Sequence, residues 1–262
     1  QKAEAGSGAL LIYGNYMGDV LNFSHAQEKL RSQGLDVRSV RVTDDVASAP
    51  YESRETRRGI AGDLFVFKIA GASAKQGDSL DEVEANAQLA NNSIFNFGVA
   101  FDGCTLPGAT ETLFSIPAGQ MSLGLGVHGE PGIGDIDRPT PEELAKMLLE
   151  RILSEPAPND SKRITVLLNG LGTMKYEELY SIYGYVERRL SELGFEIVRP
   201  EVGELVTSLD MNGCSLSVAW LEKGLEDLWV APCDSPGFTR QNIEQSFDFA
   251  DSASTPSEQP NK

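Results

Sequence analysis

Apolar and polar positions along the chain repeat with two different periods, one typical of strands and one typical of helices. Short apolar runs and one alternating segment predict strands at residues 8–14, 35–43, 163–169, 195–200 and 214–221. Apolar residues three and four positions apart predict helices at residues 19–33, 60–76, 79–91, 140–154 and 174–193. Strands and helices alternate through most of the chain, which predicts an α/β fold.

Two helix starts are marked by local chemistry. Ser79 followed by Glu82 forms a capping-box pattern, in which each residue satisfies a backbone N–H of the other. Thr140 and Glu143 form a second such pattern, with Pro141 at the first helical position. Both patterns predict where a helix begins.

The order of elements changes near residue 92. Up to that point, strand–helix–strand–helix–helix is typical of a parallel sheet covered by helices. From residue 93 to 134, short strands and glycine or proline turns dominate. We therefore predict two α/β domains with mostly parallel or mixed sheets, at residues 1–92 and 93–240, followed by a polar, disordered tail at residues 241–262.

Composition narrows the class of protein. The 262 residues are enough to bury a substantial core, and no apolar run approaches the length of a membrane span. A net charge of -17 argues against nucleic-acid binding, which needs a basic surface. Three widely spaced cysteines without a Cys-x-x-Cys pair favour reduced thiols in a cytoplasmic protein. We expect neither a nucleic-acid nor a membrane partner.

Several segments match common ligand-binding motifs in part, but the residues around them do not support the corresponding site. Residues 124–129, "GLGVHG", fit the dinucleotide pattern, but turn residues follow where a helix would have to begin. Residues 169–175, "NGLGTMK", could hold an anion at a helix N-terminus, although a plain strand-to-helix turn is the favoured interpretation. His25 is expected on the surface, because no second ligand stands at metal-binding spacing. No metal site is predicted.

A basic cluster precedes the second predicted helix. Arg54, Arg57 and Arg58 could grip a phosphate group. Because Glu52 and Glu55 flank them, the favoured interpretation is a solvated face whose charges pair with one another.

Asp19 and His128 are the two candidates for chemistry. Asp19 stands just after a predicted strand, where ligands of parallel sheets gather, but spacing alone favours the alternative that it is the N-cap of the following helix. His128 lies between glycines that allow a ligand to approach the imidazole, but it could equally be a turn histidine bonded to backbone. From spacing alone, both alternatives remain open for each residue.

Six segments occur in an order that resembles the dihydroxyacetone kinase family, in particular its ketose-binding K subunit (DhaK-like). They are "GNYMGDVLNF" (14–23), "TDDVAS" (43–48), "RRGIAG" (57–62), "GCTLPG" (103–108), "GVHGEPGI" (126–133) and "TSLDMNG" (207–213). The form "YGNYMGD" is closer to the members linked with tetruloses such as erythrulose. The resemblance covers nearly the whole chain to about residue 240.

The resemblance implies roles for four residues. In that family, the histidine corresponding to His128 adds through Nε2 to the carbonyl of a short ketose and forms a covalent hemiaminal, so polyols without a carbonyl are excluded. The aspartate corresponding to Asp19 hydrogen-bonds the terminal hydroxyl and is placed to act as its base. Gly14, which replaces a lysine of some members, and Gly129 complete the substrate-binding set.

The resemblance also implies a substrate-binding subunit of a kinase for dihydroxyacetone or another short ketose, here acting as a homodimer. We expect no cofactor on this chain, because ATP or ADP with Mg²⁺ sits on a separate L-type subunit in that family. The family's glycine-rich loop with a second histidine has no counterpart here, so the first domain is expected to be incomplete. A truncated product, a ketose-sensing regulatory paralogue without catalysis, and an inactive fragment are the alternatives.

Overall fold

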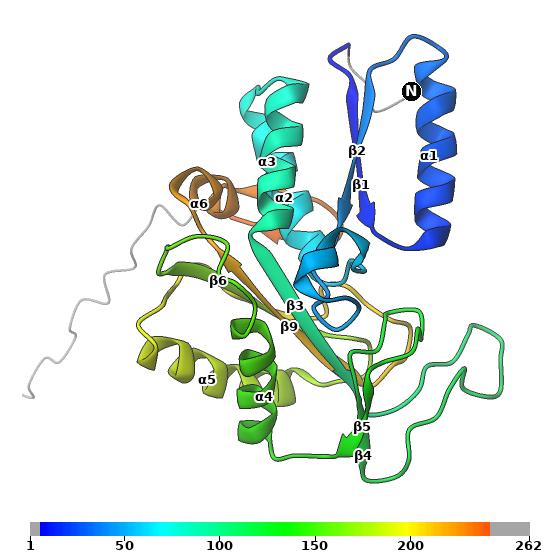
Figure 1. Ribbon diagram of the computed structural model, residues 1–262, viewed down its shortest axis with the longest axis vertical. Helices are drawn as coiled ribbons and strands as arrows, with labels where there is room; N and C mark the ends of the chain where they lie inside the picture. Colours follow the sequence, from blue (N-terminus) through cyan, green and yellow to red (C-terminus); the bar gives the residue numbers. More distant parts are fainter. Residues whose placement is uncertain (1–5, 242–262) are drawn as a thin grey trace, which may run out of the picture. The chain divides into compact units, whose positions relative to one another are not determined.

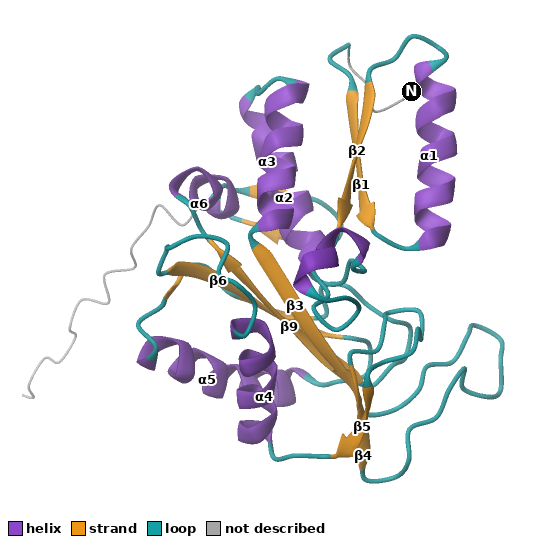
Figure 2. Ribbon diagram, in the orientation of Figure 1, coloured by secondary structure: helices purple, strands orange, loops and turns teal. Residues whose placement is uncertain are grey.

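The structure is a computed structural model in which residues 6–241 are described. The strands are β1 (Ala9–Gly14), β2 (Val37–Val42), β3 (Ile94–Ala100), β4 (Gln120–Leu123), β5 (Gly134–Asp137), β6 (Arg163–Gly170), β7 (Glu196–Ile197), β8 (Glu201–Gly203), β9 (Gly213–Trp220), β10 (Cys233–Asp234) and β11 (Thr239–Arg240). The helices are α1 (Met17–Arg31), α2 (Gly62–Gln76), α3 (Leu80–Asn92), α4 (Pro141–Leu153), α5 (Tyr176–Glu192), α6 (Lys223–Val230) and the short 3₁₀ helix η1 (Tyr51–Thr56). Figures 1 and 2 show their arrangement.

The chain divides into two compact units, Gln1–Val230 and Ala231–Lys262. In the second unit, β10 and β11 pair antiparallel. The first unit contains every other element and all the candidate residues. The boundary predicted near residue 92 stays a prediction, and the predicted tail lies outside the described residues from 242 onward.

The main sheet of the first unit has seven strands in the order β5-β4-β3-β9-β6-β7, with β8 also paired to β6. Its central pairs, β3–β9 and β9–β6, are antiparallel, whereas β7 and β8 run parallel to β6. A separate pair, β1 and β2, is parallel. The predicted α/β class with mixed sheets is therefore confirmed.

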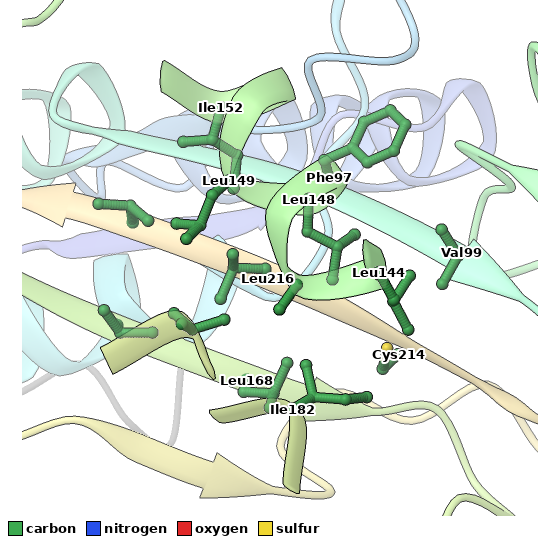
Figure 3. Close-up of a cluster of buried hydrophobic side chains, with 14 of the residues drawn as sticks. Phe97, Val99, Leu144, Leu148, Leu149, Ile152, Leu168, Ile182, Cys214 and Leu216 are labelled. Carbon is green, nitrogen blue, oxygen red and sulfur yellow. The ribbon is translucent and has the colours of Figure 1, made fainter. Parts of the chain in front are cut away.

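Helices cover both faces of the main sheet. Figure 3 shows the face beneath α4 and α5, where Leu148 and Ile182 pack on Leu168 and Leu216. On the opposite face, α2, α3 and α6 cover side chains such as Leu167. Leu167 and Leu168 are neighbours in β6 and point to opposite faces, as successive side chains of a strand do.

The β1–β2 pair is joined to the main sheet through the segment that follows β2. The backbone N–H of Asn96 in β3 donates to the carbonyl of Asp44 at 2.7 Å, and Val46 donates to the carbonyl of Asn96 at 2.9 Å. Among the strands of the described range, β1 pairs with β2 alone. A pocket of about 630 Å³ lies beside β1, with Leu10, Ile12 and Phe67 among its lining residues.

Most predicted elements agree with the structure to within two residues. Both capping boxes are present, at Ser79 with Glu82 and at Thr140 with Glu143. The strand predicted at 195–200 is confirmed only in part: the range contains β7, but Arg199 has a φ of 49°, which interrupts the extended chain before β8. Helix α6 was not predicted from the sequence.

Candidate functional site

His128 lies in the segment between β4 and β5, residues 124–133, which we call the histidine loop. Within it, Gly126 N–H donates to the carbonyl of Glu130 at 3.1 Å, and Gly129 N–H donates to that of Gly126 at 3.0 Å. Gly129 has a φ of 84°, a left-handed conformation that glycine adopts without strain. Strand β5 follows the loop instead of a helix, so the rejection of a dinucleotide fingerprint is confirmed.

The imidazole of His128 is held by one carboxylate. Its Nδ1 lies 3.1 Å from Oε1 of Glu130, and its backbone N–H donates to Oε2 of the same residue at 3.1 Å. A carboxylate only accepts hydrogen bonds, so this contact places the imidazole proton on Nδ1 and a lone pair on Nε2. The side chain is 61% exposed. The alternative of a ring bonded to backbone is wrong.

Tyr16 connects the histidine loop to the start of α1. Its ring meets the ring of His128 edge-on, with centroids 4.6 Å apart and an interplanar angle of 81°. The hydroxyl of Tyr16 is buried and has no hydrogen-bond partner within the described residues. Burial raises the pKa of this phenol, and the charge of Glu130 acts in the same direction.

Asp19 occupies the first turn of α1, as its third residue, and is half-buried. The N-cap of that helix is Tyr16, whose side chain makes no capping hydrogen bond. The alternative that Asp19 is the N-cap is therefore wrong. Tyr16, which contacts His128, lies three residues before Asp19, so the start of α1 is the element that the two candidate residues share.

The turn before α1 is fixed by Asn15. Its backbone N–H donates to the carbonyl of Val42, at the end of β2, at 3.1 Å. Its side-chain amide donates to the carbonyl of Arg57 at 2.8 Å. The carboxyl ends of β1 and β2 and the segment before α2 are thereby tied together, as expected where ligands meet a parallel sheet.

Arg58 links the histidine loop to a buried carboxylate. Its guanidinium lies 2.8 Å from the carboxylate of Asp45, whose side chain is 0% exposed, and donates to the carbonyl of Gly124 at 2.8 Å. Arg57 is also buried, with Nη2 2.9 Å from Glu155. The prediction that these arginines form a solvated face paired with Glu52 and Glu55 is wrong, because their partners lie far away in sequence.

The motif of residues 207–213 contacts this loop and is itself joined to the motif of residues 103–108. Ser208 donates from Oγ to the carbonyl of Val127, next to His128. Asp210, in the same motif, accepts from the backbone N–H of Thr105. A Cβ at Gly129 would stand 3.1 Å from the ring of Phe114. Segments that are far apart in sequence therefore enclose one loop.

Gly14, the last residue of β1, lies against two side chains of the site. A Cβ at this position would stand 3.2 Å from the ring of Tyr16 and 3.3 Å from Oδ2 of Asp63. Asp63 is the second residue of α2, and its Oδ1 is buried without a partner in the described part of the chain. Burial, then Asp44 and then Asp19, raise the pKa of Asp63 well above its ordinary value.

Sequence reasoning did not single out Tyr16, Glu130, Ser208 or Asp63. The first three lie inside the quoted motifs, and that membership was the only signal they carried. Arg58 was considered only as part of a basic cluster, and its contact with the histidine loop was not predicted. Asp63 follows the motif of residues 57–62 directly and carried no signal at all. His25 is exposed, as predicted.

The described residues contain neither a cluster that could hold a metal ion nor a helix that could span a membrane. No group of three or more His, Cys, Asp and Glu side chains between residues 6 and 241 could hold a metal ion. Within the same range, no helix is long and apolar enough to cross a membrane.

Comparison with known proteins agrees with the resemblance. The model of the Dak1 domain matches residues 1–237. An L-erythrulose 1-kinase of Mycolicibacterium smegmatis is 52% identical over 244 residues, which cover 92% of this chain and 43% of that protein. The dihydroxyacetone-binding subunit DhaK of a PTS-dependent dihydroxyacetone kinase from Listeria innocua is 40% identical over 235 residues, which cover 90% of this chain and 70% of that protein.

A comparison with a solved structure shows that the similarity extends to the three-dimensional fold. The dihydroxyacetone kinase operon co-activator Dha-DhaQ superposes with a TM-score of 0.82 at 32% identity, over 88% of this chain and 72% of that one. The chain spans less than half the length of the erythrulose kinase that it matches. It belongs to the Dak1 domain family.

Proposed function

We propose that this chain binds a short ketose covalently through His128 and presents the terminal hydroxyl of that ketose for phosphorylation. The observation that carries the proposal is the contact between Nδ1 of His128 and Glu130. It leaves the Nε2 lone pair on an exposed imidazole, which is the nucleophile that hemiaminal formation requires. The names of the relatives, kinases and binding subunits for erythrulose and dihydroxyacetone, support this substrate class.

The addition can be written with its electrons and protons balanced. The Nε2 lone pair forms a bond to the carbonyl carbon, while the C=O π electrons move to the oxygen, which takes a proton from water. The imidazole ring then carries a positive charge. Transfer of the Nδ1 proton to Glu130 restores a neutral ring, because the carboxylate lies 3.1 Å away. Glu130 then gives that proton to the hydroxide left by the water, which regenerates both the carboxylate and the water.

Asp19 has the second role in this proposal. Its carboxylate accepts a hydrogen bond from the terminal hydroxyl, orients that oxygen for in-line attack on phosphorus, and takes its proton during transfer. A partner subunit of the L type would hold the nucleotide and Mg²⁺. The phosphoryl donor would be either ATP itself or a bound ADP that a phosphotransferase protein has first rephosphorylated. The family resemblance also implies a homodimer, which sedimentation of the purified chain would test.

The covalent step is tested with dihydroxyacetone labelled with ¹³C at the carbonyl. The unaltered chain should convert the ketone resonance to that of a tetrahedral carbon attached to nitrogen, and its intact mass should rise by one ketose. His128→Ala should abolish both changes. His25→Ala, which removes the other, exposed histidine, is the matched control and should retain them. Absence of the adduct in the unaltered chain would rule out this proposal.

Ketose sensing without catalysis is the second candidate function, and the likeness to the co-activator Dha-DhaQ favours it. A phosphorylation assay with an L-type partner and nucleotide separates the two candidates. Formation of ketose phosphate supports the kinase role. An adduct on His128 that is never phosphorylated supports the sensing role instead.

A further inference from the structure

Asp63 is a polar group whose contacts within the protein do not account for its position. Asp63 is half-buried as a residue, but its Oδ1 atom is fully buried and accepts no hydrogen bond from residues 6–241. A buried carboxyl oxygen without a partner costs free energy, so such groups are rare in folded proteins and call for an explanation. The second position of α2 alone would not explain the burial.

Asp63 lies between two glycines and is only half-buried, so part of the residue is open to solvent. Its Oδ1 lies against Gly59, where a Cβ would stand 2.8 Å away. Its Oδ2 faces Gly14, which has no side chain, and Tyr16 lies on the other side of Gly14. Because Tyr16 contacts His128, the Asp63 carboxyl and the reactive imidazole flank the same tyrosine.

The charges around Asp63 favour a hydrogen-bond donor. Asp44 and Asp19 both lie close enough to oppose a second negative charge, and burial acts in the same direction, so the pKa of Asp63 is raised. A protonated Asp63 can donate a hydrogen bond from its carboxyl hydroxyl, whereas the role proposed for Asp19 is that of an acceptor. The two carboxyl groups therefore offer complementary hydrogen bonds to a polyhydroxylated molecule.

We propose that Asp63 binds the hydroxyl group that a four-carbon ketose carries in addition to the two of dihydroxyacetone, and that it thereby selects the four-carbon ketose over dihydroxyacetone. The inference rests on the proposed function. A tetrulose such as erythrulose carries one hydroxyl more than dihydroxyacetone, and a polar group left unpaired by the smaller ketose penalises its binding. The named activity of the erythrulose kinase relative agrees with this substrate class.

The test compares two ketoses on four forms of the 262-residue chain. Binding of erythrulose and of dihydroxyacetone is titrated by the ¹³C resonance of the adduct for the unaltered chain, Asp63→Ala, Asp63→Asn and Glu142→Ala. Glu142 is the matched control, because it holds the same second position of a helix, in α4, and is exposed. Asp63→Asn keeps a donor of similar shape and remains informative if Asp63→Ala does not fold.

Asp63→Ala should weaken erythrulose binding about tenfold more than dihydroxyacetone binding, the scale expected for one buried hydrogen bond. Asp63→Asn should retain most of the preference for erythrulose, and Glu142→Ala should retain all of it. An equal loss for both ketoses, or no loss for either, would overturn the role of Asp63. An unaltered chain that forms no adduct would instead overturn the proposed function and this inference with it.

Discussion

At the scale of single residues, the candidate site is built around backbone that only glycine can supply. Any side chain at Gly126 would collide with the carboxylate of Glu130, and one at Gly129 would press on Phe114. Glu130 could not reach both the Nδ1 and the backbone N–H of His128 if the loop opened to relieve those contacts. The orientation of the nucleophile therefore depends on positions that carry no reactive group.

Gly129→Ala should reduce adduct formation about tenfold, because it combines a φ of 84° with a Cβ 3.1 Å from Phe114. Gly119→Ala is the matched control: that glycine has a φ of 83°, but nothing lies within 4 Å of its Cβ position. Both variants should lose about 1 kcal/mol of unfolding free energy in urea titrations. Equal adduct formation in the two variants would contradict the role of the loop.

Arg58→Lys should weaken the anchor of the histidine loop. The guanidinium contacts Asp45 and the carbonyl of Gly124 through Nη2 and also donates to Asp45 from Nε at 2.9 Å, whereas the lysine side chain lacks this rigid fork and its second donor nitrogen. We expect the ketose affinity to fall about fivefold to tenfold and the unfolding free energy to fall by about 1–2 kcal/mol. Arg54→Lys is the control, since Arg54 bonds carbonyls of Asn91 and Asn92 rather than the loop. Unchanged affinity in Arg58→Lys would exclude an anchoring role.

At the scale of elements, local sequence patterns predicted best those helices whose first turn is capped by side chains close by in the sequence. Helices α3 and α4 begin at capping boxes, whose bonds join residues only three positions apart. Helix α1 differs, because its N-cap Tyr16 makes no capping bond and contacts His128 instead. Helix α6 has eight residues and packs through Leu225, Leu228 and Trp229, a pattern too short to distinguish from other structures.

Thr140→Ala should lower the unfolding free energy by about 1 kcal/mol, because it removes the oxygen that accepts from the backbone N–H of Glu143. Thr140→Ser keeps that oxygen and should leave the stability unchanged. Ketose binding should be the same in both variants, because α4 packs on the main sheet. Urea denaturation and the ¹³C titration measure the two effects, and a loss of binding in Thr140→Ala would contradict this separation.

At the scale of the whole molecule, some of the many acidic residues are buried in the interior instead of lying on the surface. The chain has a net charge of -17, and Asp44 and Asp45 are fully buried beside the site. Burial raises the pKa of Asp44 from 3.8 to about 7, although N–H groups of Ile60 and Gly62 donate to its carboxylate and act in the opposite direction. Burial also raises the pKa values of Asp45 and Asp63.

The unfolding free energy should therefore fall as the pH rises from about 4 to about 8. A carboxyl whose pKa is higher in the folded state binds its proton more tightly there, so the folded state is favoured below pH 3.8 and loses that advantage as the pH passes 7. For Asp44, the scale is about 4 kcal/mol.

Denaturation in high salt screens repulsion between surface charges and should leave this pH dependence in place. Asp44→Asn should flatten it. A chain whose stability rises between about pH 5 and pH 8, or an Asp44→Asn variant with an unchanged slope, would contradict this assignment of the buried acids.

The sequence by itself determined the α/β class, most helix and strand positions and the two candidate reactive residues, because periodicity, capping and family motifs are all local in the chain. The tertiary structure alone decided which residues surround them. Arg58 contacts Asp45 and Gly124, and Asp63 lies against Gly14. The ring of Tyr16 contacts that of His128, 112 residues away in the sequence. Spacing along the chain carries no information about such contacts, because they form only when separate strands bring their carboxyl ends together.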